Sequence, residues 1–397
     1  MQDNLFRPVE DIAASVFGGV ASFFGFGRDG ITEPPSDGRV RLPDDLFAQP
    51  GVQTEWWYYT GHCETETGRR FGFELVFFKR RTDRDRLGGV PLMALANPMY
   101  FAHFAISDID DRRFRYEHIR SFGLPLDVPV SMSETACDIR LGEWSLREVA
   151  GKHILHATLA GGFVFDAVLE SAKPVVLNGD GGITRKNAGA SKHFSYTRMS
   201  VAGQTLDDGV IETFTGAAWM DREFGSWEQG NWDWFSIQFD DETELMIYRF
   251  ATGSSGLDGG STGTFVDRDG KCQYLERKDF EIEVLSTWTS GKTRAEYPSR
   301  WRVRVPVLDI AVEIVTLIDD QELDTRGTTM IVYWEGACSV AGTRAGNPIS
   351  GRAYVELVGY DRSHENMDIA TFLFTDPIRR IRKMFRILES FPGSTLH

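Results

Sequence analysis

The segment Glu55–His62 brings together a carboxyl group, four consecutive aromatic side chains and an imidazole. An acid and aromatic rings in one place can protonate a substrate and stabilise the cation that forms. On a strand, Glu55, Trp57 and Tyr59 share one face, whereas Trp56, Tyr58 and His62 share the other. Both faces are therefore aromatic. This pattern predicts either a strand packed on both sides or the wall of a cavity for an apolar ligand.

A second candidate centre is the segment Trp219–Glu223. A carboxyl group buried among apolar rings stays neutral and can act as a general acid, because burial disfavours its charged form. Asp221, between Trp219 and Phe224, is the first candidate acid, and Glu55 is the second. The alternative for Asp221 is an ion pair with Arg222 or a turn cap. Tyr248 completes the candidate catalytic residues, since its hydroxyl could orient water; packing alone is its alternative.

The other candidate site residues are expected to contact an apolar substrate: Trp56, Trp57, Tyr59, Trp219, Trp232, Trp234, His62, Glu74 and His103. Glu74 shares a strand face with apolar side chains, where an ion pair with an arginine such as Arg249 is the alternative to catalysis. A lone histidine on a strand more often has a structural role. No zinc spacing, nucleotide-binding glycine loop or nucleophile elbow occurs in the sequence, so we predict neither a metal nor another cofactor.

The sequence predicts that these residues lie on β-strands. Residues 55–62 and 69–78 predict a hairpin, and later short alternating segments are separated by Gly, Asp and Asn clusters, as in barrels and sandwiches. The glycine-rich run 253–263 is interpreted as a hairpin loop. The aromatic strand around residues 232–235, followed by a polar turn and an apolar strand, repeats the opening pattern and indicates an internal duplication. It places residues 219–223 at the domain junction, where ligand sites commonly form.

Several separated motifs resemble the carotenoid 1,2-hydratase (hydroxyneurosporene synthase) superfamily: residues 55–62, 69–78, 219–223, 231–238, 333–338 and 351–360. The resemblance implies an all-β fold of two tandem lipocalin-like β-barrel domains that hold apolar ligands. We expect an N-terminal apolar arm and linker (1–40), a first barrel (41–226), a second barrel (227–375) and a C-terminal basic amphipathic helix (376–397).

The resemblance leaves the chemistry open, because similar proteins include hydratases and pericyclases. We expect a cofactor-free hydratase that adds water to a C=C bond of a hydrophobic isoprenoid or polyene. The alternatives are a pericyclase or cyclase of a polyene natural product, and a non-catalytic carrier of apolar molecules. One position departs from the carotenoid branch, because Tyr248 is followed by Arg249 and Phe250 where an acidic residue is expected.

Composition bounds the partners. A net charge of −15 without a basic stripe argues against nucleic acid. Four scattered cysteines predict buried thiols in a reducing compartment, so we expect a cytoplasmic protein. Residues 12–27 are apolar but lack the flanks of a signal peptide. With the basic helix, they predict peripheral association with the inner membrane, and packing of both segments on the barrels is the alternative. The sequence leaves the oligomeric state open.

Overall fold

The computed structural model describes residues 39–83, 86–87, 90–91, 93, 96–186, 189–227, 231–250 and 260–361. Nearly all of the regular structure in these ranges is β-strand. It includes three short 3₁₀ helices, which are η1 (Asp44–Leu46), η3 (Arg277–Asp279) and η4 (Pro306–Leu308). The expected apolar arm, the C-terminal amphipathic helix and most of the glycine-rich run 253–263 lie outside the described residues.

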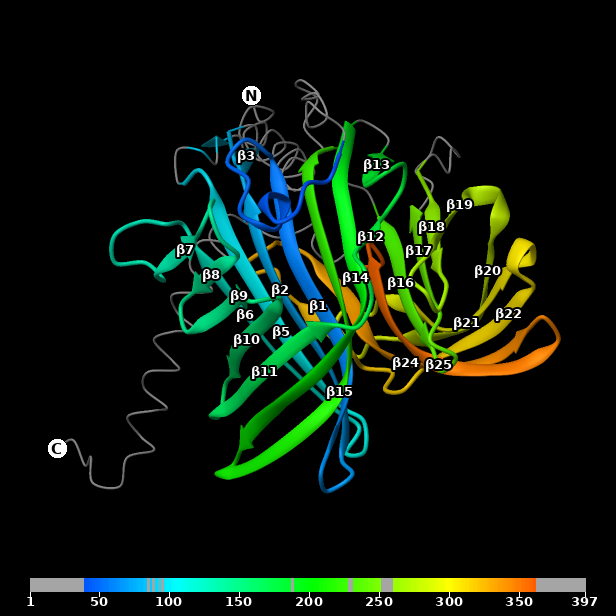
Figure 1. Ribbon diagram of the computed structural model, residues 1–397. Coiled ribbons are helices and arrows are strands. Elements are labelled where there is room, and N and C mark those ends of the chain that lie inside the picture. Colours follow the sequence, from blue (N-terminus) through cyan, green and yellow to red (C-terminus); the bar gives the residue numbers. More distant parts are fainter. Residues whose placement is uncertain are drawn as a thin grey trace, which may run out of the picture.

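The first barrel-like sheet runs in the order β6-β5-β2-β1-β15-β14-β11-β10-β9-β8-β7, with β12 and β13 paired to β14 (Figure 1). Its strands are β1 (Thr54–Thr65), β2 (Arg70–Arg80), β5 (Met99–Asp108), β6 (Arg113–Ser121), β7 (Val130–Met132), β8 (Asp138–Leu141), β9 (Trp144–Val149), β10 (Lys152–Leu159), β11 (Phe163–Ser171), β12 (Val176–Leu177), β13 (Ile183–Lys186), β14 (Gly189–Asp207) and β15 (Val210–Ser226). A separate small ladder pairs β3 (Arg86–Leu87) with β4 (Val90–Pro91). The predicted hairpin over residues 55–78 is the antiparallel pair β1–β2.

The second barrel-like sheet runs in the order β19-β18-β17-β16-β25-β24-β22-β21-β20, with β23 paired to β24. Its strands are β16 (Trp232–Phe239), β17 (Glu244–Phe250), β18 (Thr262–Val266), β19 (Cys272–Glu276), β20 (Glu281–Thr289), β21 (Glu296–Val305), β22 (Ile310–Thr316), β23 (Glu322–Asp324), β24 (Val332–Arg344) and β25 (Asn347–Val358). In both sheets the first long strand lies between the second and the last. The predicted all-β fold with two barrel-like sheets is therefore confirmed, and the shared strand order is the one expected from a duplication.

Three apolar cores result from the alternation of side chains along the strands. One fills the first barrel and includes Trp57 and Tyr59, and a second fills the other barrel around Trp301 and Trp334. The third lies between the two barrels, where the outward-facing side chains of both sheets meet; it contains Tyr58, Val76, Ala105, Trp219, Trp232, Trp234, Met246, Tyr248, Phe250, Leu323, Tyr333, Ala337, Tyr354 and Val358. Each aromatic strand thus contributes side chains from one face to the core inside its barrel and from the other face to the core between the barrels.

The two barrels lie side by side, with β1, β2 and β14 against β25, β24 and β16 (Figure 1). Gly72 on β2 permits this approach, because an added Cβ atom would lie 2.9 Å from the Cβ of Ala337. Hydrogen bonds cross the contact from His62 Nε2 to the carbonyl of Ala353 (3.0 Å) and from Ser107 Oγ to Gln321 Oε1 (2.6 Å).

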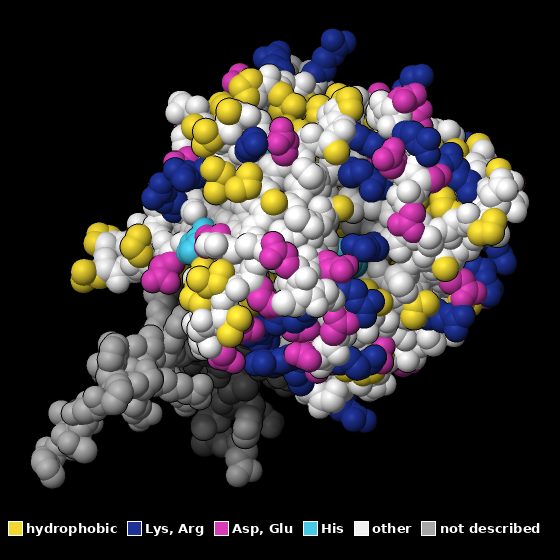
Figure 2. All heavy atoms as spheres, turned by 60° about the horizontal axis from the view of Figure 1, so that its bottom comes forward, with side chains coloured by type: hydrophobic (Ala, Val, Ile, Leu, Met, Phe, Trp, Pro, Cys, Tyr) yellow, Lys and Arg dark blue, Asp and Glu magenta, His cyan; other side chains and the backbone are white. Residues whose placement is uncertain are grey.

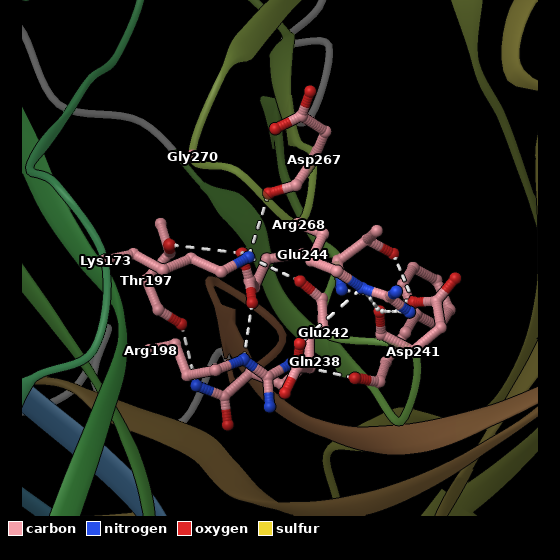
Figure 3. Close-up of polar contacts among 12 residues, drawn as sticks. Lys173, Thr197, Arg198, Gln238, Asp241, Glu242, Glu244, Asp267, Arg268 and Gly270 are labelled. Atoms are coloured by element: carbon pink, nitrogen blue, oxygen red, sulfur yellow. Dashed lines mark hydrogen bonds and ion pairs between the residues drawn. The ribbon is translucent and has the colours of Figure 1, made fainter.

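A polar clasp around the buried Glu244 also joins the barrels (Figure 3). Lys173, between β11 and β12, places its Nζ atom 2.8 Å from Glu244 Oε2 and 2.9 Å from the carbonyl of Asp267. Arg198 on β14 donates to Glu244 Oε1 at 2.6 Å. Because charged donors from the first barrel satisfy a carboxylate of the second, the clasp fixes their relative position and hence the shape of the space between them.

The face drawn in Figure 2 shows interspersed acidic and basic side chains with scattered apolar ones. Among the described residues, no helix is long and apolar enough to cross a membrane. Cys63, Cys137 and Cys338 are buried free thiols, as expected, but Cys272 is exposed. Its place on the short strand β19, near the end of the second sheet, leaves it less covered than the other three.

Candidate active site

A pocket opens between the two barrels and holds about 870 Å³ of empty space, part of which communicates with solvent. Its walls are the outward faces of both sheets together with a segment before β24. The lining residues are Thr54, Trp56, Tyr58, Glu74, Val76, Phe78, Arg80, Phe101, His103, His193, Asp221, Glu223, Trp232, Trp234, Tyr248, Thr329, Ile331, Tyr333, Glu335 and Glu356. Large aromatic rings and several carboxyl groups therefore face one space.

Strand register explains why these residues meet. In the first sheet, the partners of Tyr58 are Asp221 on β15 and Val76 on β2, and Val76 is opposite His103 on β5. In the second sheet, Trp234 is opposite Tyr248 and Glu356, and Glu356 is opposite Glu335 on β24. Residues opposite each other in a ladder project from the same face. Each barrel thus presents one row of polar and aromatic side chains to the pocket.

Glu74 and Glu335 are buried carboxyl groups from different barrels that face this pocket. Burial, with the nearby Glu356, raises the pKa of Glu74 to about 8. Burial, with Glu74 and Glu356, raises the pKa of Glu335 well above its ordinary value. Glu74 is therefore mostly neutral near pH 7 and can give up a proton, and burial shifts the pKa of Glu335 in the same direction. Tyr58 donates a hydrogen bond to Glu335 Oε1.

The carboxyl group of Glu74 is connected to His103 through hydrogen bonds of Tyr333. Tyr333 donates its hydroxyl hydrogen to Glu74 Oε1 at 3.2 Å, and the hydroxyl oxygen of Tyr333 lies 2.7 Å from His103 Nδ1. Burial, with the nearby His118, holds the pKa of His103 well below its usual range. The imidazole is therefore neutral at pH 7, with one nitrogen available as a proton acceptor.

Asp221, the first candidate acid, lies in the pocket with three donors around its carboxyl group. Trp219 Nε1 lies 2.7 Å from Oδ1, His193 Nε2 lies 3.2 Å from Oδ2, and Ser195 donates to Oδ1. The alternative ion pair with Arg222 does not form, because Arg222 points into the first barrel. An acceptor surrounded by donors is better suited to stabilising a nearby positive charge than to delivering a proton.

Of the predicted site residues, the structure brings seven to the pocket lining: Trp56, Glu74, His103, Asp221, Trp232, Trp234 and Tyr248. Trp219 lies behind Asp221, with its ring 6.1 Å from that of Trp234. Glu74 does not pair with Arg249, which binds Asp233 instead.

The remaining four predicted residues lie elsewhere. Glu55 is inside the first barrel, 2.5 Å from both Lys79 Nζ and Arg222 Nη2, so the structure does not place it as a pocket acid. Trp57 and Tyr59 belong to the first barrel core, and His62 holds the contact between barrels. Glu55, Trp57 and Tyr59 lie away from the pocket because their face of β1 points into the barrel, whereas His62 is on the outward face and contacts Ala353 of the second barrel.

Sequence reasoning did not select Tyr58, Tyr333, Glu335 or Glu356 as site residues. A signal was available, because Trp334 alternates with Tyr333 and Glu335 as Trp57 alternates with Trp56 and Tyr58. In each case the central tryptophan fills its barrel and its neighbours face the pocket. A carboxyl on the outward face of such a strand marks a pocket residue here.

Replacing Trp56 by Ala should weaken binding of an apolar ligand in the pocket by roughly 1–3 kcal/mol, because Trp56 faces the pocket. Trp57→Ala is the matched variant on the opposite face. It should instead destabilise the fold by about 3–5 kcal/mol, since this side chain is fully buried in the first barrel. Fluorescence titration and urea unfolding separate the two effects. Equal losses of affinity in both folded variants would contradict this assignment.

Across the described residues, no group of three or more His, Cys, Asp or Glu side chains is arranged to hold a metal ion. The pocket carboxyls instead contact tyrosine, tryptophan, serine and histidine donors.

Comparison with known proteins gives a family and a fold. The AttH-like family model matches residues 33–360. A crystal structure of a Nitrosomonas europaea protein assigned to AttH is 28% identical and superposes with a TM-score of 0.71, covering 83% of this chain and all of that one. Kievitone hydratase from Nectria haematococca shares the fold at 15% identity, with a TM-score of 0.65, covering 85% of this chain and 98% of that one.

Among curated relatives, the dehydratase asqC of Emericella nidulans is 22% identical over 203 residues. The match covers 49% of this chain and 58% of that relative, so the chain spans less than two thirds of its length. The predicted lipocalin-like superfamily is confirmed by these matches, whereas its carotenoid branch is not singled out.

Proposed function

We propose that this chain, which belongs to the AttH-like family, is a hydro-lyase that adds water to, or removes it from, an apolar unsaturated small molecule in the pocket between the barrels. One observation carries the proposal: two buried carboxyl groups with raised pKa values, Glu74 and Glu335, face a pocket lined by aromatic rings. The dehydratase name of one relative and the hydratase name of a protein with the same fold support it.

The chemistry requires a proton donor and stabilisation of a cation. Protonation of an alkene carbon by Glu74 forms a C–H bond and leaves a tertiary carbocation, which water then captures. In the reverse direction, the group that took the proton of water returns it to the departing hydroxyl group, and the Glu74 carboxylate takes the proton from carbon. The faces of Trp56, Trp232 and Trp234 and the carboxylate of Asp221 are available to stabilise the positive charge.

The aromatic lining also supports the finer prediction of an isoprenoid or polyene substrate. Trp232 stacks on Tyr248 with ring centroids 6.2 Å apart, and Tyr58 meets Trp234 edge-on at 5.2 Å. Such rings offer apolar contact along a carbon chain, with polar groups only at intervals. We therefore propose an acyclic isoprenoid with a trisubstituted double bond or a tertiary alcohol.

The test is incorporation of oxygen from isotopically labelled water. Purified protein is incubated with lycopene, an acyclic polyene, or with linalool, a tertiary allylic alcohol, and the products are analysed by mass spectrometry. A hydro-lyase should place label in a product alcohol of lycopene or exchange the hydroxyl oxygen of linalool. A new cyclic product without label would indicate a cyclase, and binding without any product would indicate a carrier; either outcome would overturn the proposal for these substrates.

A further inference from the structure

Three polar atoms of the pocket residues have no hydrogen-bond partner within the described part of the chain. They are Nε2 of His103, Oε2 of Glu74 and Oε2 of Glu335, and all three atoms are buried. Leaving a buried polar group unpaired is unfavourable, so native structures rarely retain several in one place without a ligand or water between them. All three residues line the pocket, which makes a bound oxygen atom their natural partner.

The second polar atoms of His103 and Glu74, Nδ1 and Oε1, are connected through the hydroxyl of Tyr333. His103 Nδ1 lies 2.7 Å from the hydroxyl of Tyr333, which donates to Glu74 Oε1 at 3.2 Å. Since the Tyr333 hydrogen is used on Glu74, the hydrogen between His103 and Tyr333 belongs to Nδ1, and Nε2 carries a lone pair. The ring of His103 is held in place by Phe78, at 5.3 Å, and Tyr333, at 5.7 Å.

We propose that His103 is the base that takes the proton of the reacting water, and that Tyr333 returns a proton to Glu74 in a closed circuit. The inference rests on the proposed hydro-lyase function. Glu74 is the acid at one end of this circuit, His103 Nε2 is the acceptor at the other, and the reacting oxygen lies between them.

Protons and electron pairs balance around the circuit. The π electrons of the alkene take the Glu74 proton to form a C–H bond, which leaves a carbocation and a carboxylate. A lone pair of water forms the C–O bond, and a water proton passes to His103 Nε2 as Nδ1–H passes its proton to the Tyr333 oxygen. The Tyr333 hydroxyl proton passes to Glu74 Oε1. Water has then been added and Glu74 is neutral again, with its proton on Oε1 and the hydrogen of His103 on Nε2. A water molecule that passes the Nε2 proton to Glu74 Oε2, with the reverse proton shift through Tyr333, restores the resting tautomer. Dehydration starts from the changed tautomer and runs through the addition steps in reverse.

The charge states required at rest agree with the surroundings. Burial keeps the pKa of His103 low, so the neutral imidazole can accept a proton, and burial raises the pKa of Glu74 to about 8, so the carboxyl can donate one. His118 is the other imidazole near His103, at a ring distance of 6.3 Å, and it bonds Thr328 Oγ1 at 2.9 Å. Because Tyr333 contacts Glu74 directly, Glu74 can regain a proton during this step without exchange with bulk solvent.

The chain contains a matched control for this arrangement. Tyr59 and His153, inside the first barrel, form a second buried tyrosine–histidine pair with the same 2.7 Å separation between hydroxyl and Nδ1. Burial lowers the pKa of His153 to about 4. His153 does not line the pocket, so His153→Gln imposes the same change in a buried pair without touching the proposed circuit.

The experiment measures linalool oxygen exchange in wild type, His103→Gln, Tyr333→Phe and His153→Gln. We expect kcat to fall by about 10²-fold or more in the first two variants, with KM changed only a few-fold, while His153→Gln stays near wild type. The proton inventory in mixed light and heavy water should be curved in wild type and linear in Tyr333→Phe, a change that a packing role would not produce. Wild-type kcat in a folded His103→Gln, or the same inventory in wild type and Tyr333→Phe, would overturn the circuit and leave the hydro-lyase proposal standing.

Nitrogen NMR of labelled histidine tests the circuit even if wild type acts on neither substrate, a result that would overturn the proposed function alone. His103 should carry its proton on Nδ1 in wild type and lose that preference in Tyr333→Phe, whereas the His153 resonances should be unchanged. A proton on Nε2 of His103 in the resting wild-type protein would overturn the circuit, since no acceptor would then face the pocket.

Discussion

Replacing Glu74 by Gln should reduce turnover by about 10²- to 10⁴-fold while leaving affinity for the apolar substrate nearly unchanged. The carboxyl is buried, faces the pocket and is neutral near pH 7, and the amide keeps its size and polarity but cannot release a proton. Steady-state oxygen exchange with linalool, together with ligand titration by fluorescence, measures both quantities. The effect appears in kcat because the proton is transferred only in the transition state.

Asp221→Asn is the control that separates the two candidate acids. It also replaces a pocket carboxyl by its amide, but at a position that accepts hydrogen bonds from Trp219, His193 and Ser195. We expect a smaller loss than in Glu74→Gln, since only stabilisation of positive charge is removed. A larger loss in Asp221→Asn, with Glu74→Gln active, would return the acid role to Asp221 and contradict the present assignment.

Glu74→Gln should also change how the free energy of unfolding depends on pH. Glu74 keeps its proton up to about pH 8 in the folded chain, whereas the unfolded chain loses it near the ordinary value of 4.5. The folded state therefore binds more protons between these values, and the contribution of Glu74 to stability is lost as pH rises through this window. Glu74→Gln lacks this loss, so its stability relative to wild type should increase with pH by up to roughly 1.4 kcal/mol per unit. Wild-type turnover should likewise fall as pH rises through about 8.

The strand periodicity made much of this fold predictable. Alternation along residues 55–62 placed the side chains of Trp56 and Trp57 on opposite faces, as the structure has them, and the repeated aromatic strand at Trp232 and Trp234 indicated an internal duplication, which agrees with the similar strand order of the two sheets. Both results follow from local geometry, because successive residues of a strand must face opposite sides. The family resemblance supplied the barrels, which periodicity alone does not distinguish from sandwiches.

Which face of β1 meets the ligand could not be read from the same pattern. The two faces have similar composition, and the choice depends on contacts between β1, β2 and the second barrel, far away in sequence. Glu55 illustrates the consequence, since a carboxyl beside tryptophans looked like an acid and proved to be an ion-pair partner. Glu335 was missed for the complementary reason: its high pKa arises from burial and from Glu74 and Glu356, and these groups converge only after both barrels have folded.

The buried ion pair between Glu55 and Arg222 should contribute strongly to the stability of the first barrel. Arg222 is fully buried, with its Nη2 atom 2.5 Å from Glu55 Oε2 and its guanidinium 3.9 Å from the ring of Trp57. Arg222→Ala should lower the free energy of unfolding by about 3–5 kcal/mol, because it removes one of the two cations that pair with the buried carboxylate of Glu55 and opens a void beside Trp57. Arg70→Ala is the matched control, since Arg70 pairs with Asp110 at the surface with 56% of its side chain exposed, and it should leave the free energy of unfolding nearly unchanged. Urea unfolding measures both values when the dependence of unfolding free energy on urea concentration is the same in both variants. Similar small losses of unfolding free energy would show that the buried ion pair contributes little to the stability of the barrel.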